Sequence, residues 1–167
     1  MPEFLDIVDA NDQVIGKASR DDIYKKSLCH RIVHVLIFDE QGNLALQLRS
    51  KRVTFCPSHW STTVGGHVQT GESYEEGALR EFEEELGTTN PLEFFSKDWY
   101  EANDLRKFLT TYKTVYSGPF NPNPDDVERV DFFSADEIKD MINKGEKFHP
   151  ELLFLLKKYF LKDRSQN

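Results

Sequence analysis

The chain has 167 residues, of which 38% are hydrophobic and 30% are charged, typical of a soluble globular protein. The formal net charge of −8 argues against binding to nucleic-acid polymers, which requires a basic surface. We find no apolar run of signal-peptide or membrane-spanning length, and Cys29 and Cys56 form no CxxC pair. We therefore expect one cytoplasmic domain over residues 1–167, with free thiols, no membrane contact and a frayed tail over residues 162–167.

The first half of the chain favours strands. We expect them where apolar residues alternate or where Val and Ile gather, over residues 4–8, 13–18, 30–38, 44–48 and 60–64. Ser19 can cap a brief helix through Lys26, with acidic residues in the first turn. Residues 39–43 predict a hairpin loop between two of the strands.

The second half adds three helices and three strands. Two helices begin at capping boxes, in which a serine and a glutamate three residues on bind each other's backbone N–H groups: Ser73 with Glu76, and Ser134 with Glu137. Gly87 ends the first, Lys144 is near the end of the second, and Pro150 starts a third. Strands are expected over residues 92–100, 108–116 and 127–133, the first two of them paired. This order predicts a mixed sheet with helices on both faces, of the α/β or α+β class.

The helix after Ser73 carries a group of carboxylates. At about 100° per residue, Glu81, Glu84 and Glu85 share one face, whereas Glu83 points elsewhere. A neighbouring face should pack on the core and holds Ala78, Leu79, Phe82 and Leu86. Like charges at this spacing repel by roughly a few tenths of a kcal/mol per pair. A divalent cation would reverse the sign, since Mg²⁺ prefers oxygen ligands, and a solvated acidic face is the alternative.

A basic cluster lies between two of the expected strands. Arg49, Lys51 and Arg52 are the densest group of cations in this acidic chain. They are typical of a phosphate-binding arm, and a solvated loop is the alternative. The loop that follows contains Phe55 and ends at Trp60, which we expect to be core residues rather than base-stacking ones.

The spacing of the glycines and charged residues is more specific. Five residues separate Gly66 from Glu72, and seven more lead to the pair Arg80-Glu81, followed by Glu84-Glu85 and Gly87. This pattern closely resembles the Nudix box of the Nudix hydrolase superfamily, although Phe82 and Thr88 replace bulky aliphatic residues. The resemblance implies the Nudix fold, an α/β/α sandwich with a mixed central sheet. It also implies hydrolysis, with Mg²⁺ or Mn²⁺, of a small diphosphate linked to another group, X.

The resemblance assigns roles to particular residues. Glu81, Glu84, Glu85 and the carbonyl of Gly66 (or Gly65) would hold the metal, and Arg80 would orient the glutamates. Glu81 is one candidate for the general base; a loop acid is another, and Glu128 is preferred to Asp125 and Asp126. Arg49, Lys51 and Arg52 would bind the distal phosphate. The sequence leaves X open among nucleoside diphosphates or triphosphates, nucleotide sugars and prenyl or other small diphosphates, and it leaves the oligomeric state open, a homodimer included.

The segment from residue 30 to residue 71 resembles the isopentenyl-diphosphate isomerase-like subgroup, through His30, Gly42, Arg49, Pro57, Trp60 and the run from Gly66 to Gly71. Isomerase chemistry needs a cysteine where this chain has Gly65, and glutamates on a strand that here, over residues 108–116, has no carboxylate. We therefore reject the isomerase alternative. His30 and His67 match its metal site as remnants, and for His67 a hydrogen bond to the box loop is the preferred alternative, so the roles of both stay open. A non-catalytic diphosphate-binding protein is a further alternative, which the intact box disfavours.

Overall fold

The computed structural model describes residues 2–161, in which nine strands and four helices follow one another. The strands are β1 (Phe4–Val8), β2 (Val14–Ser19), β3 (His30–Phe38), β4 (Leu44–Arg49), β5 (Trp60–Thr62), β6 (Val64–His67), β7 (Glu93–Ala102), β8 (Leu105–Val115) and β9 (Val127–Phe133). The helices are α1 (Arg20–Lys25), α2 (Tyr74–Leu86), α3 (Ala135–Asn143) and α4 (Pro150–Tyr159). Residues 162–167 lie outside the described residues, so the frayed tail and the single domain over residues 1–167 stay predictions.

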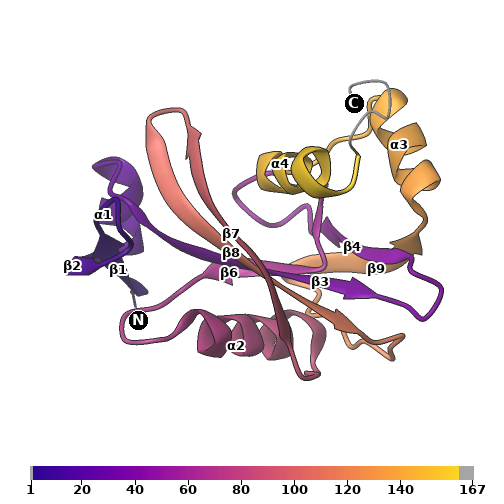
Figure 1. Ribbon diagram of the computed structural model, residues 1–167, viewed down its shortest axis with the longest axis horizontal. Coiled ribbons are helices and arrows are strands. Elements are labelled where there is room, and N and C mark those ends of the chain that lie inside the picture. Colours follow the sequence, from indigo (N-terminus) through magenta and orange to yellow (C-terminus); the bar gives the residue numbers. More distant parts are fainter. Residues whose placement is uncertain (1, 162–167) are drawn as a thin grey trace.

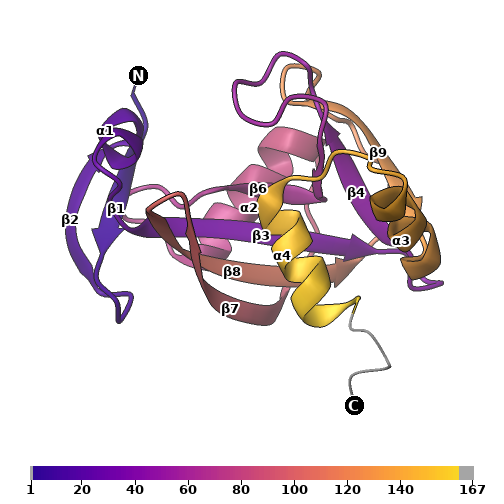
Figure 2. The same ribbon diagram turned by 90° about the horizontal axis from the view of Figure 1, so that it is seen from above.

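Seven strands form one mixed sheet. Its main order is β5-β4-β3-β8-β7, with β6 pairing on β3 and β9 pairing on β4. β3 and β8 run parallel, and the other pairs in this sheet are antiparallel. β1 and β2 form a separate antiparallel pair, which lies with α1 at one end of the molecule, away from α3 (Figures 1 and 2).

The loop expected between β3 and β4 is present, but the two strands pair only next to this loop and then separate. They are paired at Phe38 and Leu44 alone, after which β6 occupies the free edge of β3, and β5 and β9 flank β4. The single strand expected over residues 60–64 is therefore wrong. The segment forms two strands, because β5 pairs with β4 and β6 pairs with β3. Thr63 lies at this change of partner, where its hydroxyl donates to the Ala45 carbonyl and accepts from the Ile37 N–H.

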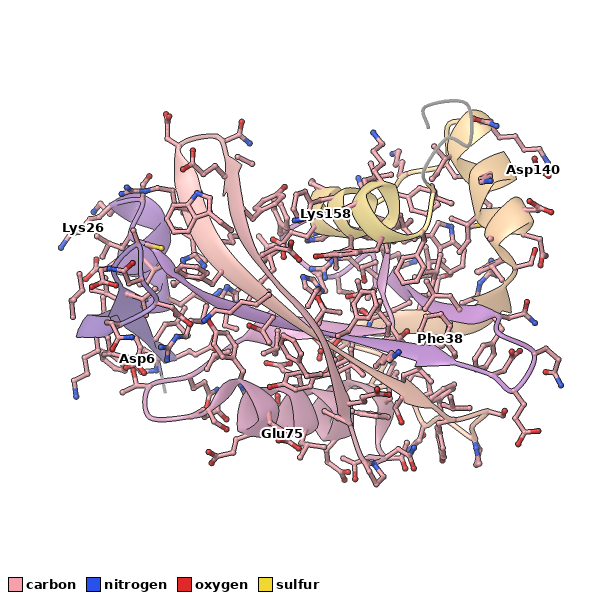
Figure 3. The ribbon with its side chains drawn as sticks, viewed as in Figure 1. Asp6, Lys26, Phe38, Glu75, Asp140 and Lys158 are labelled. Carbon is pink, nitrogen blue, oxygen red and sulfur yellow. The ribbon has the colours of Figure 1, made fainter. Side chains whose placement is uncertain are left out.

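Helices cover both faces of the sheet, as the Nudix resemblance predicted (Figure 1). α2 packs on one face through Phe82 and Leu86, and α3 and α4 cover the other face in a core cluster that includes Trp60. Figure 3 shows Glu75 of α2 and Lys158 of α4 on opposite sides of the sheet. None of the helices in the described part of the chain combines the length and apolar content needed to cross a bilayer.

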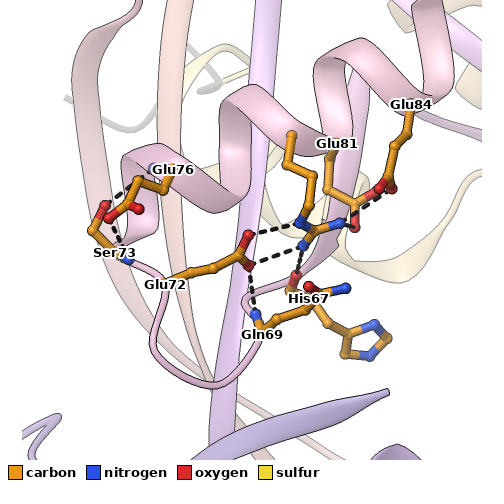
Figure 4. A network of polar contacts seen from close by, with 8 residues as sticks. His67, Gln69, Glu72, Ser73, Glu76, Glu81 and Glu84 are labelled. Carbon is orange, nitrogen blue, oxygen red and sulfur yellow. Dashed lines mark hydrogen bonds and ion pairs between the residues drawn. The ribbon is translucent and has the colours of Figure 1, made fainter. Parts of the chain in front are cut away.

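The limits of α2 follow from local chemistry. The Ser73 hydroxyl accepts from the Glu76 N–H, and the Glu76 carboxylate accepts from the Ser73 N–H (Figure 4). Gly87 ends the helix at φ 68°. The predicted core face holds, except that Leu79 is only half-buried. Glu85 is buried beside Leu86, with 7% of its surface exposed. One member of the carboxylate face therefore points into the protein.

The aromatic residues of the loop before β5 separate in the structure. Trp60 is 5% exposed and packs against the Phe133 ring, so its assignment to the core is confirmed. Phe55 is 56% exposed and meets the His149 ring edge-on at 5.3 Å between ring centroids, so its assignment to the core was wrong. The loop that carries Phe55 lies outside the sheet, and the Arg49 guanidinium donates to the Phe55 carbonyl there.

A buried carboxylate fastens the β1–β2 pair to the main sheet. Asp12, in the turn between β1 and β2 at φ 60°, accepts hydrogen bonds from Arg31 Nε at 2.7 Å, from the Tyr74 hydroxyl at 2.8 Å and from Lys97. These donors lie on β3, α2 and β7. Burial raises the pKa of Asp12, but the hydrogen bonds from Lys97, Arg31 and Tyr74 outweigh it and hold the pKa below the usual 3.8.

We expect Asp12→Asn to lower the free energy of unfolding by about 2 kcal/mol, the typical contribution of hydrogen bonds to a charged group. Asn tolerates the left-handed backbone of this position, so the loss reports the carboxylate rather than strain. The contribution should be complete above pH 3.8 and decline as the pH falls towards the lowered pKa. Urea unfolding at several pH values checks this, with Glu40→Gln in an exposed loop as control. Equal losses in both variants would contradict the assignment.

Candidate active site

A cavity of about 1370 Å³ extends from the face of α2, past β6, to the first turn of α4. It lies where β3 and β4 separate, and side chains of both half-sheets line it, among them His34 of β3 and Gln47 of β4. Residues 52–55 and 125–126 contribute to its walls. The change of strand partner after β5 therefore creates the space in which the predicted site residues can meet.

Glu81 and Glu85 face the cavity from α2 and are crowded together. Gln47 Nε2 donates to Glu85 Oε1 at 2.7 Å, whereas Glu85 Oε2 is buried and has no partner among the described residues. Burial raises the pKa of both carboxyl groups, and the adjacent charge of Glu81 raises that of Glu85 further. Glu85, with one oxygen left unpaired beside the charge of Glu81, lacks a positive partner among the described residues.

Arg80 gathers the other carboxylates of the box (Figure 4). Its guanidinium donates through Nε and Nη2 to both oxygens of Glu72, at 2.7 and 3.0 Å. It also donates through Nη1 to Glu81 at 2.9 Å and Glu84 at 3.1 Å, and through Nη2 to the His67 carbonyl at 2.9 Å. Glu72 in turn accepts from the Gln69 N–H at 2.7 Å. This network joins the loop after β6 to α2 and orients the carboxylates.

The two glycines of β6 leave room for different neighbours. A Cβ atom at Gly66 would lie 2.3 Å from Glu81 Cδ, so only glycine lets this carboxylate approach the strand. A Cβ atom at Gly65 would lie 3.0 Å from His34 Nδ1 and 3.2 Å from Thr62 Oγ1. Because successive residues of a strand point to opposite faces, Gly66 faces α2 and Gly65 faces His34.

The structure brings some of the predicted binding residues to the cavity and not others. Arg49 and Arg52 line it, where Arg49 donates to the Phe55 carbonyl and Arg52 donates to Asp125 at 3.1 Å. Lys51 is exposed in the turn and does not line it.

Among the predicted acids, Asp125 and Asp126 line the cavity, whereas Glu128 is exposed and does not. Val127 is buried, so Glu128, next along β9, points to the other side of the strand. The charge of Asp126 also contributes to the raised pKa of Glu85. Asp126 is therefore better placed than Glu128 to act on a molecule in the cavity.

The two histidines expected as remnants of a metal site do lie together. The His30 and His67 rings stack at 5.7 Å between centroids, and the Tyr24 hydroxyl lies 2.6 Å from His67 Nε2. Burial lowers the pKa of His30 to about 4 and that of His67 well below 6.5. Lys107 lies beside His30 in the register of β3 and β8. Neutral imidazoles can ligate a metal, but within the described residues no third His, Cys, Asp or Glu side chain joins these two to complete a metal site.

Sequence reasoning missed several residues of the cavity. Glu72 was part of the box spacing but received no role. Gln47 lies on the face of β4 opposite the leucines, and a polar residue in an apolar strand was the available signal. His34 gave the same signal in β3. Lys107 lies just before the strand expected over residues 108–116, so it was not assigned to that strand. Glu151 lies in the first turn of α4, where an acidic residue is common.

Comparison with known proteins agrees with this architecture. The family model described as NUDIX domain matches residues 29–156. An uncharacterized Nudix hydrolase of Yersinia pestis is 31% identical over 166 residues, covering 99% of this chain and 90% of the relative. A protein named isopentenyl-diphosphate Delta-isomerase 2, from Photorhabdus laumondii, is 33% identical, covering 87% and 85%.

Among solved structures, DR0079 from Deinococcus radiodurans superposes with a TM-score of 0.82 at 27% identity, over 95% of this chain and 100% of that one. The likeness thus extends over nearly the whole chain, and relatives of similar length carry the hydrolase name. The chain belongs to the Nudix family, and the protein is a Nudix hydrolase.

Proposed function

We propose that the protein hydrolyses the diphosphate linkage of a small organic diphosphate with Mg²⁺ or Mn²⁺ held by the carboxylates of α2. The observation that carries the metal proposal is Glu85 Oε2, which is buried without a partner beside Glu81. A divalent cation would neutralise both raised-pKa carboxylates at once and satisfy this oxygen.

The donors in this part of the cavity fit a hard cation. They are carboxylate oxygens, joined by the backbone carbonyl of Gly66, and oxygen is the ligand atom that Mg²⁺ and Mn²⁺ prefer. Within the described residues, no three His, Cys, Asp or Glu side chains already form a closed ligand set. Glu81 and Glu84 are instead turned towards Arg80, at 2.9 and 3.1 Å. Both would have to turn partly away from the guanidinium to bind a metal.

Different residues of the chain would have different roles in hydrolysis. A bound divalent ion would offset charge on the phosphoryl oxygens and acidify a water molecule. Arg80 keeps Glu81 and Glu84 in position through Glu72, and Arg49 and Arg52 offer donors for the distal phosphate. Asp126 takes over from Glu128 as the favoured loop acid for accepting the proton of water, with Glu81 as the alternative.

Isomerase chemistry on isopentenyl diphosphate is disfavoured, although a relative carries that name. The cysteine that it requires would stand at Gly65, which has no proton to give, and where a Cβ atom would lie tightly at 3.0 Å from His34 Nδ1 and 3.2 Å from Thr62 Oγ1. Cys56 lies in the loop before β5 and outside the cavity lining. A non-catalytic diphosphate-binding role is disfavoured by the complete set of box carboxylates. A cytoplasmic location, no nucleic-acid polymer as partner and an open oligomeric state stay predictions from the sequence.

We expect phosphate or pyrophosphate release from at least one member of a panel of diphosphates in Mg²⁺ or Mn²⁺, and none in chelator. The panel should contain nucleoside diphosphates and triphosphates, nucleotide sugars, and small alkyl and prenyl diphosphates. Full turnover in chelator would end the metal proposal. A parallel incubation with isopentenyl diphosphate should give no dimethylallyl diphosphate. Steady formation of this isomer would restore the isomerase alternative.

We expect Glu81→Gln and Glu85→Gln each to lower turnover by at least about 10²-fold, equivalent to roughly 2.7 kcal/mol of barrier. Glu83→Gln, an exposed neighbour, should leave turnover nearly unchanged. Because the folded pKa values of Glu81 and Glu85 lie above 4.5, their charge destabilises the metal-free protein at neutral pH. Both variants should therefore melt at the same or a higher temperature in chelator, and equal damage from Glu83→Gln would refute the site.

We expect Gly66→Ala to lower turnover by about 10²-fold, because the new Cβ would displace Glu81 and misplacement by about 1 Å has this effect. Gly16→Ala is a matched control, since its Cβ would lie at an ordinary 3.7 Å from Ile7 Cδ1. Circular dichroism melting separates misfolding from local displacement. Full turnover in folded Gly66→Ala would show that the position of Glu81 is not critical.

A further inference from the structure

Three ionisable side chains are buried together on the side of β6 that faces away from α2. They come from β3, β8 and α4, and are His34, Lys107 and Glu151, with 5%, 7% and 5% of their surface exposed. Glu151 Oε1 lies 2.9 Å from His34 Nε2, and Glu151 Oε2 accepts from Lys107 Nζ at 2.9 Å. All three line the same cavity as the carboxylates of α2, and Gly65 lies between them and Gly66.

Stability alone does not account for this cluster. A buried ion pair is often no more stabilising than apolar residues of the same volume, because both charges lose their hydration. α4 already packs on the core through Leu152, Leu155 and Leu156, each 1% exposed. Charges that add little to packing and that line a cavity are characteristic of a binding site.

Glu151 is the anchor of the cluster rather than a free acceptor. Burial raises its pKa, but the hydrogen bond from His34 and the charge of Lys107 outweigh it and hold the pKa well below 4.5. Glu151 is therefore a carboxylate, with both oxygens engaged.

His34 is held between two neighbours. Its Nε2 faces the Glu151 carboxylate, which only accepts, at 2.9 Å, and its Nδ1 lies 2.7 Å from the Thr62 hydroxyl. His34 therefore occupies one oxygen of Glu151 and leaves the other to Lys107.

The donors that remain free belong to Lys107 and His149. Among the described residues, Glu151 is the one acceptor within hydrogen-bond distance of Lys107 Nζ, and the ammonium group has three protons. His149 Nδ1 accepts from the Glu151 N–H at 3.1 Å, and burial lowers the pKa of His149 to about 4, so its ring is neutral with the proton on Nε2. Lys107, His149 and Tyr100 all line the cavity.

The free protons of the Lys107 ammonium group, beside the free N–H of the His149 ring, complement an anion. A phosphate monoester or a carboxylate would satisfy both free donors, whereas an apolar prenyl chain would leave them buried without partners, at about 1–3 kcal/mol each. The geometry points to an anionic group on X, bound in a subsite formed by Lys107 and His149 on the Glu151–His34 anchor. The assignment of this anion to X rests on the proposed hydrolysis at α2, and the substrate would be a diphosphate with a second acidic group.

The subsite can be tested without catalysis. In chelator, the carboxylates of α2 repel anions, so saturable binding of inorganic phosphate or of acetate, at constant ionic strength, reports another site. We expect calorimetry to detect binding of at least one of these anions. Binding of phosphate would indicate a phosphate group on X, and binding of acetate would indicate a carboxylate. Binding should weaken at least tenfold in the double variant Lys107→Met/Glu151→Gln, which removes both charges of the pair together. Lys113→Met, on the same strand but more exposed, is the matched control and should bind as the wild type does.

Three results would overturn the subsite: no saturable binding of either anion, unchanged affinity in the double variant, or loss of binding in Arg52→Met with full binding in the double variant. If the double variant does not fold, NMR of the wild-type protein decides, since the signals of His149 and Tyr100 should shift on titration with the anion. Shifts confined to the surroundings of Arg52 would refute the subsite. Failure of metal-dependent hydrolysis would leave this binding result unaffected, so the two proposals fail separately.

Discussion

β3 and β4 separate after a single pairing, between Phe38 and Leu44, and the cavity lies where they part. Each strand then takes new neighbours, β6 for β3 and both β5 and β9 for β4, so neither of them becomes an edge of the sheet. Thr63 bridges the two half-sheets at this point. The opening instead places β5 and β6 at its edges, and it admits side chains from both layers of helices.

A second constraint is electrostatic. α2 holds three carboxylates on one face, and two of them are buried or half-buried close together. Arg80 offsets part of the repulsion, but it reaches Glu81 and Glu84 rather than Glu85, whose one partner in the described chain is the neutral Gln47. The fold tolerates this because Ser73, Glu76 and Gly87 fix the ends of the helix and Phe82 and Leu86 anchor it in the core. The remaining imbalance is what makes a divalent cation a favourable partner.

The two ends of the cavity differ in chemistry. The end at α2 is rich in carboxylates, and the end at α4 carries the His34–Glu151–Lys107 cluster with its surplus of donors. Gly65 and Gly66 separate them, and the lack of a side chain at each lets His34 approach from one face and Glu81 from the other. Under the two proposals, a substrate that extends past these glycines would have its diphosphate at the carboxylates and X at the Lys107 and His149 donors.

Features that depend on neighbours along the chain could be predicted from the amino-acid sequence. The capping boxes, Gly87 and the spacing of the Nudix box located α2, its carboxylate face and the family, because helix periodicity and caps act within a few residues. The sequence also predicted the order of the elements and the mixed sheet between two helical layers.

The set of residues that reach the cavity depends on contacts between distant segments and could not be predicted in this way. Val127 is buried whereas its neighbour Glu128 is exposed, and Phe55 lies outside the core. His34 contacts Glu151, which is 117 residues away in the sequence. These outcomes depend on strand partners and on helix docking, which join segments far apart in the chain and leave no local pattern to read.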